Sequence, residues 1–283
     1  MAGRGVRRPM AGVMKVWVLG SGSRGNATVI DNGSTRVLVD AGFSARELKH
    51  RFAVAGIAPQ SIDALIVTHE HGDHACGAVS AARRWSWAVH ATSGTVRGAP
   101  ELAKVGVQTF SAGDSLTFGT MNVVAVATAH DAAEPVGVIA TDVLTGARAA
   151  VVLDLGRDSP YLHQHLRDLD MLVLESNHDE VMLAQSPYPI SVQRRIAGGL
   201  GHLSNREAAR LARACAHLGM QHLVLAHLSE TCNTADHALA TASAALARTR
   251  FKGRITAATQ GNVLAIDVGA RRGGRAMQLA LAL

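Results

Sequence analysis

The N-terminal half of the chain alternates short apolar runs with turn-forming residues. Residues 16–20 (VWVLG) predict a strand, and residues 27–40 predict a β-hairpin because two β-branched runs flank the turn at Asp31-Asn32-Gly33. Ser44 and Glu47 have the spacing of a capping box and predict the start of a helix. The remaining runs predict two strands, residues 63–69 and 86–92, and two helices, residues 74–85 and 93–105.

The C-terminal half begins with strands and then mixes strands with helices. Residues 107–156 contain five apolar runs separated by Gly, Asp and Pro, which predict five successive strands. Residues 176–201 give no clear pattern, and Ser204 and Glu207 form a second capping box. The other predicted elements are helices at 160–169, 204–218 and 234–248, and strands at 171–175, 222–228, 254–259 and 263–267. Because neither half alternates strictly, we expect two sheets with helices on their outer faces.

The composition is that of a globular protein. The chain has 283 residues, of which 48% are hydrophobic and 18% charged. No apolar run approaches the roughly 20 residues that span a membrane, and the stretch after Arg4, Arg7 and Arg8 lacks the apolar core of a signal peptide. The three cysteines form no C-x-x-C pair, which suits a reducing compartment. We therefore expect a cytoplasmic protein with no membrane partner.

The net charge of +6 comes from the two ends of the chain. Residues 1–13 contain three arginines and no acid, and residues 269–283 contain three more. Without these arginines the chain has 22 basic and 22 acidic residues, so bulk charge is weak evidence for any partner. We expect a disordered leader at residues 1–13, one folded domain at residues 14–268 and a basic tail at residues 269–283.

Three glycines near the N-terminus have the spacing of a dinucleotide-binding loop. Gly20, Gly22 and Gly25 match G-x-G-x-x-G, and Asp40 follows Gly20 by twenty residues. A true loop of this kind opens a helix that leads to a second strand ending in the acid. The fourteen residues between Gly25 and Asp40 contain a turn and β-branched runs instead. We therefore expect a tight loop between two strands.

The most specific pattern is THEHGDH at residues 68–74, which follows a predicted strand and precedes a helix. His69 and His71 project to the same side of an extended backbone, and Asp73 and His74 stand at the helix start. Three imidazoles and a carboxylate within six residues predict a metal-binding loop. One loop cannot complete two metal sites, so further ligands are expected at the ends of other strands: His130, Asp154 and His227.

The THEHGDH motif and its partners resemble the metallo-β-lactamase superfamily. The resemblance covers nearly all of residues 14–268 and implies a hydrolase domain with an α/β fold, a four-layer αββα sandwich, and a dinuclear metal site. The resemblance implies that one metal is held by His69, His71 and His130. It implies that the other is held by Asp73, His74 and His227, and that Asp154 bridges the two. Asp40 would orient the ligand histidines. Because β-lactamases usually have Cys where Asp154 stands, antibiotic hydrolysis is not expected.

Four further stretches resemble the YycJ/WalJ-type branch of that superfamily: LGSGSRGN at 19–26, LESNHD at 174–179, GHLSN at 201–205 and LAHLSETCN at 225–233. This branch is similar to ribonuclease Z and other nucleic-acid phosphodiesterases, in which a Glu and a His act near the leaving group. The resemblance therefore implies catalytic roles for Glu175 and His202. His178 lies close to Glu175 in the sequence and is left unassigned.

The resemblance therefore implies a dinuclear-metal-dependent phosphodiesterase or nuclease that acts on DNA or RNA through a metal-activated hydroxide. Asp73 is expected to take a proton from the water, and His202, kept protonated by Glu175, to protonate the leaving oxygen. Zinc suits the His/Asp ligands, and manganese is compatible with the two carboxylates. A glycine-rich loop and a helix N-terminus supply the residues expected to contact substrate phosphate: Ser21, Ser23, Asn26 and Ser204.

Two other functions are compatible with parts of this pattern. A glyoxalase-II-like thioesterase or another small-ester hydrolase would use the same metal ligands without needing His202. A regulatory protein linked to two-component signalling, which the resemblance to this branch also implies, would have no reason to keep the complete ligand set. Nucleic acid is therefore the expected partner.

Overall fold

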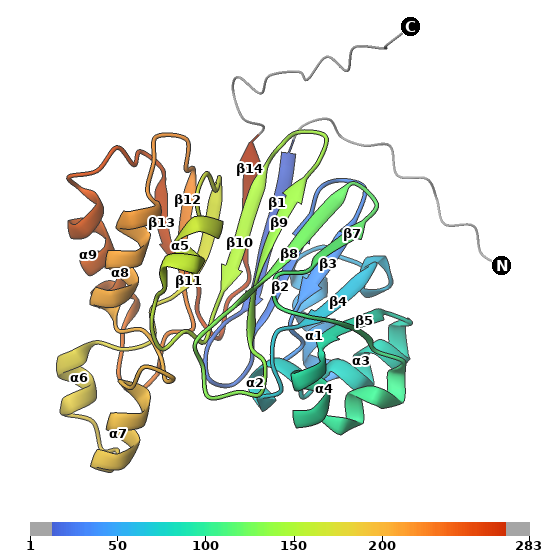
Figure 1. Ribbon diagram of the computed structural model, residues 1–283, viewed down its shortest axis with the longest axis horizontal. Helices are drawn as coiled ribbons and strands as arrows, with labels where there is room; N and C mark the ends of the chain where they lie inside the picture. Colours follow the sequence, from blue (N-terminus) through green and yellow to red (C-terminus); the bar gives the residue numbers. More distant parts are fainter. Residues whose placement is uncertain (1–12, 270–283) are drawn as a thin grey trace, which may run out of the picture.

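The computed structural model describes residues 13–269, whose strands form two seven-stranded sheets packed face to face (Figure 1). In spatial order the first sheet contains β14 (Leu264–Gly269), β1 (Val13–Gly20), β2 (Ala27–Asp31), β3 (Arg36–Val39), β4 (Ala64–Val67), β5 (Ala88–Thr92) and β6 (Gln108–Phe110). The second contains β13 (Arg254–Ala257), β12 (His222–Ala226), β11 (Met171–Glu175), β10 (Arg148–Val152), β9 (Val136–Asp142), β8 (Met121–Ala127) and β7 (Ser115–Phe118).

Side chains that alternate along each strand divide the core into three apolar layers. In β11, Met171 and Val173 join the layer between the two sheets, whereas Leu172 and Leu174 pack against helices. Three helices cover the second sheet: α5 (Pro160–His165), α8 (Asn205–Cys215) and α9 (Ala235–Leu246). Two helices cover the first sheet: α1 (Ala45–Val54) and α3 (Ala78–Trp85). The expected four-layer αββα sandwich is therefore confirmed, and Figure 1 shows helices on both sides of the paired sheets.

Parallel strands in both sheets bring several strand ends together. In the first sheet β3, β4, β5 and β6 run parallel, and in the second sheet β10, β11, β12 and β13 do so. β8 points the same way as β10 because both are antiparallel to β9. Ligand sites in sheets of this kind form beyond the carboxyl ends of the strands, so the residues that follow these strands are where chemistry is expected.

Several predicted helices are shorter or interrupted. The helix expected over 74–85 is divided into α2 (Gly72–Ala75) and α3 at Gly77, where a Cβ would lie 1.8 Å from the carbonyl oxygen of Phe43. The helix expected over 93–105 ends as α4 (Ser93–Gly98) before Pro100, and a 3-10 helix (Pro100–Val105) follows. Residues 176–201, whose sequence pattern predicted no element, contain two short helices, α6 (Glu180–Ala184) and α7 (Ile190–Ile196).

The expected leader and tail lie almost wholly outside the described residues. Of the two segments, only Val13 and Gly269 are described, and they pair at the ends of β1 and β14. Within residues 13–269 no helix is both long and apolar enough to cross a membrane.

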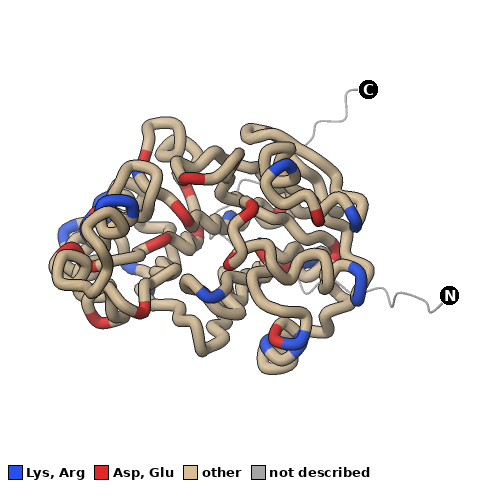
Figure 2. Tube along the Cα trace, turned by 90° about the horizontal axis from the view of Figure 1, so that it is seen from below, with Lys and Arg blue, Asp and Glu red and all other residues tan. Residues whose placement is uncertain are grey.

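Seen from the lower edge of Figure 1, Asp and Glu positions run across the middle of the molecule, while Lys and Arg lie mainly toward its outline (Figure 2).

Candidate metal centre

The predicted ligands converge from both sheets onto one edge of the sandwich. His69 comes two residues after β4, and the rest of its motif leads into α2. Asp154 comes two residues after β10, His227 comes directly after β12, and His130 comes three residues after β8. The structure thus places side chains from positions 69 to 227 of the chain in one cluster, of which the first sheet and the second sheet each supply a part.

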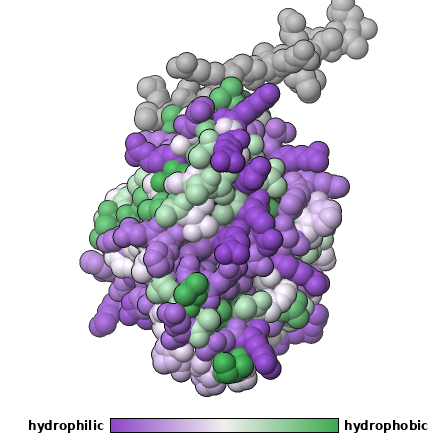
Figure 3. Space-filling view, turned by 90° about the vertical axis from the view of Figure 1, so that its left-hand side faces the viewer, coloured by the Kyte–Doolittle hydropathy of each residue, from purple (hydrophilic) through white to green (hydrophobic). Residues whose placement is uncertain are grey.

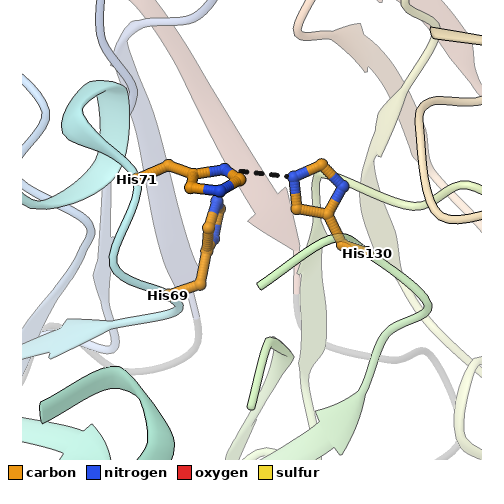
Figure 4. Close-up of side chains that lie close together, drawn as sticks. All are labelled: His69, His71 and His130. Atoms are coloured by element: carbon orange, nitrogen blue, oxygen red, sulfur yellow. Dashed lines mark hydrogen bonds between the residues drawn. The ribbon is translucent and has the colours of Figure 1, made fainter. Parts of the chain in front are cut away.

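Three histidines form one potential metal-binding group. Ring nitrogens of His69, His71 and His130 all lie within 4.8 Å of one another (Figure 4). His130 Nδ1 donates to the carbonyl oxygen of Gly201 at 3.0 Å, which leaves Nε2 to face His71 Nδ1 at 3.2 Å. Nε2 of His69 is buried and has no hydrogen-bond partner among the described residues. The three rings therefore turn a nitrogen toward a common point.

A second group consists of Asp73, His74 and His227. Asp73 Oδ2 lies 3.3 Å from His227 Nε2 and 3.5 Å from His74 Nε2. His74 Nδ1 donates to Asp40 Oδ2 at 2.7 Å, and Thr68 fixes the same carboxylate through its backbone N–H at 2.8 Å. Asp40 therefore orients a histidine of the second group, in the manner expected of a carboxylate behind a metal ligand.

Asp154 lies between the two groups and is within reach of both. Its Oδ2 is 2.6 Å from His74 Nε2 and 3.9 Å from His69 Nε2, and its Oδ1 is 3.7 Å from His130 Nε2. The side chain is buried, and Oδ2 has no hydrogen-bond partner among the described residues. A carboxylate in this position is within reach of a cation held by either group.

In the described part of the chain, several buried acceptor atoms of the cluster face one another without a hydrogen-bond donor between them. Because His74 Nδ1 donates to Asp40, a neutral His74 would point the lone pair of Nε2 at the Asp154 oxygen. Nε2 of His227 is also buried without a hydrogen-bond partner among residues 13–269. Buried polar atoms are almost always partnered, so acceptors gathered in this way are explained by a bound cation. The residues present therefore fit divalent metal ions.

Charge interactions within the cluster shift several pKa values. Burial opposes a charge on His227, but the nearby carboxylates of Asp154, Asp73 and Glu175 outweigh it and raise the pKa to about 10. Burial lowers the pKa of His69 well below its usual value and keeps that ring neutral. Burial also works against an ionised Asp73, yet the nearby His227 and His74 hold its pKa well below the usual range.

Three residues of the site have strained backbones that no sequence pattern predicted. Asp40, Asp154 and His227 have φ values of 63°, 52° and 53°, in the left-handed region that disfavours residues with a Cβ. Each stands just beyond a strand, and the backbone N–H of His227 is held by the Ser21 hydroxyl at 2.9 Å. Such strain, of order 1–3 kcal/mol per residue, persists where the surrounding structure overrides it, as at functional sites.

Glu175 and His202 form a hydrogen-bonded pair beside the cluster. Glu175 Oε1 accepts from His202 Nδ1 at 2.8 Å and from His227 Nδ1 at 2.9 Å, and Oε2 accepts from the backbone N–H groups of Leu155 and Leu203. Burial opposes the ionised form of Glu175, but the adjacent His202 and His227 lower its pKa to about 2. Burial likewise opposes charge on His202, and Glu175 outweighs it and raises the pKa of His202.

A cavity of about 220 Å³ opens onto this cluster. Among the residues expected to act in catalysis, Asp73 and His202 line it, whereas Glu175 is fully buried behind His202. The remaining lining residues are Ser23, His71, His130, Asp131, Asp154, Val192, Arg195, Ile196, Gly201 and His227. Asp131 and the α7 residues had no signal in the sequence, because they belong to a loop and to a helix without a buried face.

Of the four residues expected to contact phosphate, only Ser23 lines the cavity. Ser21 and Asn26 are buried, and Ser21 Oγ donates to Asn26 Oδ1 at 2.8 Å. Asn26 Nδ2 lies 3.0 Å from His74 Nε2, and the Asn26 backbone N–H donates to the Asp73 carbonyl oxygen at 2.7 Å. Ser21 and Asn26 thus hold residues of the ligand cluster in place. Ser23 is the residue of this loop that lines the cavity, where a phosphate could reach it.

Ser204 is occupied by the helix it caps. Its hydroxyl accepts from the backbone N–H of Glu207, whose side chain accepts from the Ser204 backbone N–H in a complete capping box. Ser204 is buried and does not line the cavity. His178, for which the sequence indicates no role, is also buried, and it lines a separate hollow between α6 and α7.

Comparisons with known proteins agree with this geometry. A family model described as "Beta-lactamase superfamily domain" matches residues 35–228. The chain is 34% identical to "Exodeoxyribonuclease YycJ" of Bacillus anthracis over 75% of its length and 81% of the relative. It is 29% identical to "Exodeoxyribonuclease WalJ" of Streptococcus pneumoniae over 77% of its length and 83% of the relative. The crystal structure of the metallo-β-lactamase fold protein YhfI from Bacillus subtilis superposes with a TM-score of 0.68 at 20% identity, covering 90% of this chain and all of that one.

Proposed function

Because this chain belongs to the β-lactamase superfamily, we propose that it is a metal-dependent exonuclease that hydrolyses phosphodiester bonds of DNA. Relatives named as exodeoxyribonucleases align over about four fifths of their own length, which supports a nuclease over other hydrolases. The observation that carries the proposal is the Glu175–His202 pair: Glu175 raises the pKa of His202, which lines the cavity beside the candidate metal ligands and would be the proton donor. A phosphodiester has a leaving oxygen that needs this proton.

Two divalent cations, zinc in the first instance and manganese as the alternative, suit the two groups of ligands. His69, His71 and His130 would hold one of them, and the other would be held by Asp73, His74 and His227, with Asp154 shared. When bound, such a pair of cations neutralises phosphate charge and lowers the pKa of a coordinated water. Asp40 and Glu175 support the ligands from behind, because each accepts a hydrogen bond from the far nitrogen of a ligand histidine.

Two side chains of the protein would carry out the two proton transfers, one from the attacking water and one to the leaving oxygen. Asp73 lines the cavity and is ionised, because the neighbouring histidines hold its pKa well below the usual range, so its carboxylate would accept the proton of the attacking water. His202 donates to the leaving oxygen through Nε2, since Nδ1 is held by Glu175. Ser23, exposed at the cavity wall, is placed to contact a substrate phosphate.

The proposal is tested with purified, metal-loaded protein and end-labelled single-stranded and duplex DNA, RNA and a thioester. We expect release of nucleotides from DNA ends, and a loss of about 100-fold or more in kcat for His202→Ala and for Asp73→Ala. His50→Ala, on the exposed face of α1, is the matched control and should cleave like the wild type. Thioester turnover without cleavage of nucleic acid, or full activity of both site variants, would contradict the proposal.

A further inference from the structure

The cavity contains one side chain with a permanent positive charge. Its described lining includes three carboxylates, four histidines and Arg195, but no lysine and no second arginine. A DNA strand carries one negative charge at every nucleotide, so a cavity that cleaves such a strand must accommodate phosphates beyond the one under attack. Arg195 is the group in this cavity with the charge to receive one of them.

Arg195 stands on α7, a short helix whose two faces border different hollows. Val192, Arg195 and Ile196 line the metal cavity. The opposite face lines a more apolar hollow of about 330 Å³, and its α7 members include Ile190 and Arg194. No residue of α7 is buried, and the surrounding face is mostly hydrophilic with separate small hydrophobic patches (Figure 3). Arg194 and Arg195 are therefore adjacent, exposed arginines that point to different surroundings.

Asp131 holds the Arg195 guanidinium at the cavity. Nε and Nη2 of Arg195 lie 2.8 and 2.7 Å from the same oxygen, Asp131 Oδ2. The other oxygen, Oδ1, is 3.3 Å from His130 Nε2, so a single carboxylate separates the guanidinium from the metal-ligand cluster. The Asp131 backbone N–H also donates to the carbonyl oxygen of Leu200, just beyond α7. These contacts fix Arg195 next to the site before any substrate arrives.

The guanidinium keeps donors for a further partner. The Arg195 side chain is 71% exposed, and Nη1 makes no hydrogen bond or ion pair with residues 13–269. An arginine that is pre-positioned by a carboxylate and has N–H groups free is suited to bidentate recognition of phosphate. A purely structural ion pair between α7 and the body would have no need to stand on the cavity wall.

We propose that Arg195 binds the phosphate next to the scissile linkage and so makes the enzyme prefer DNA chains to small phosphodiesters. The inference rests on the proposed function, and it adds a specificity-determining residue that the sequence pattern did not indicate. A small diester has no second phosphate, so it gains nothing from Arg195. A DNA chain gains one charge-assisted contact, which acts on binding and on KM.

The test compares Arg195→Gln with Arg194→Gln as the matched control on the same helix, both in the metal-loaded full chain. Binding of a phosphorothioate single-stranded oligonucleotide, which resists cleavage, is measured by fluorescence anisotropy over a series of salt concentrations. For Arg195→Gln we expect about tenfold weaker binding and a salt slope smaller by about one counterion, with little change for Arg194→Gln. Arg195→Lys, which keeps the charge without the planar fork, should recover part of the loss.

Kinetics then separate this role from the others. For Arg195→Gln, KM for DNA should rise about tenfold, while kcat/KM for bis(4-nitrophenyl) phosphate stays at the wild-type value. Replacing the neighbouring phosphate by an uncharged methylphosphonate should weaken the wild type but have no further effect on Arg195→Gln. Equal losses on both substrates, an equal effect of Arg194→Gln, or additive effects of the methylphosphonate would overturn the inference. Arg195-dependent DNA binding without cleavage of any phosphodiester would sink the proposed function and leave the phosphate contact standing.

Discussion

At the scale of single residues, Glu175 shows how one carboxylate serves two parts of the site. Oε1 receives hydrogen bonds from both His202 and His227, while Oε2 receives two backbone N–H groups. All of its partners are donors, so the site requires a group that only accepts. The same oxygen therefore fixes a predicted metal ligand and the predicted proton donor relative to each other.

Replacing Glu175 by Gln should damage both stability and activity. The amide NH2 would face donors wherever it turned, which lowers the free energy of unfolding by about 2 kcal/mol or more. His202 would also lose the carboxylate that raises its pKa, so the alkaline limb of the kcat profile should move to lower pH. Thermal unfolding and pH–rate profiles measure the two effects. The control is Glu180→Gln, an exposed carboxylate whose loss should cost little, and an unmoved alkaline limb in Glu175→Gln would contradict the assignment.

The sequence predicted which residues gather at the site but not how every side chain points. Residues that end strands, such as Asp154 and His227, are indicated by the apolar run before them, and the structure brings them together. Ser21 and Asn26 belong to a loop whose course depends on Gly22 and Gly25, with φ values of 148° and 155°. Side-chain direction in such a loop is set by the neighbouring β12 end and THEHGDH loop, which are distant in sequence.

At the scale of elements, the sequence predicted the strands and helices that bury an apolar face, and it missed those that do not. Strands and the helices α1, α3, α8 and α9 bury apolar faces, and their periodicity predicted them. α7 buries no residue, and Pro187 and Pro189 precede it, so its short pattern has no apolar stripe. The helix that supplies Arg195 was therefore the least predictable element of the site. Its position depends on polar contacts such as the Arg195–Asp131 ion pair.

Close backbone contacts between elements give a prediction about two glycines of the site. A Cβ on Gly42 would lie 1.7 Å from the Asp73 carbonyl oxygen, because the segment after β3 packs directly on the metal-binding loop. Gly72, inside the THEHGDH motif, would meet nothing within 4 Å. We expect Gly42→Ala to cost about 1–3 kcal/mol or more and to lower metal content, and Gly72→Ala to be nearly neutral. Chemical denaturation and metal analysis test this, and the reverse order would show that the turn at Gly72 is the tighter constraint.

At the scale of the whole molecule, the two sheets meet at the metal centre as well as in the core. The THEHGDH residues follow β4 of the first sheet, whereas His130, Asp154 and His227 follow strands of the second. Bound cations would link the two halves of the sandwich at this edge. Their removal should therefore lower the stability of the whole fold, by about 2.7 kcal/mol per site that had been held at a hundredfold excess over its Kd.

The stability of the metal-free protein should depend on pH through His227 and Glu175. In the metal-free protein, His227 has a pKa near 10 against 6.5 when unfolded, so its contribution is complete below pH 6.5 and is lost as the pH rises toward 10. Glu175 has a pKa near 2 against 4.5 when unfolded, so its contribution is present above pH 4.5 and is lost toward pH 2. Stability without metal should therefore be greatest between about pH 4.5 and 6.5.

Metal binding reverses the alkaline part of this dependence because a ligand histidine must be neutral, so protons and cations compete for His227. The stabilisation by zinc should grow as the pH rises from 6.5 toward 10, where the metal-free protein becomes weaker. Thermal unfolding of chelator-treated and zinc-loaded protein over this range measures the difference. Two curves that stay parallel would mean that His227 is not a metal ligand, whereas curves that diverge with pH in the wild type but not in His227→Gln would identify it as one.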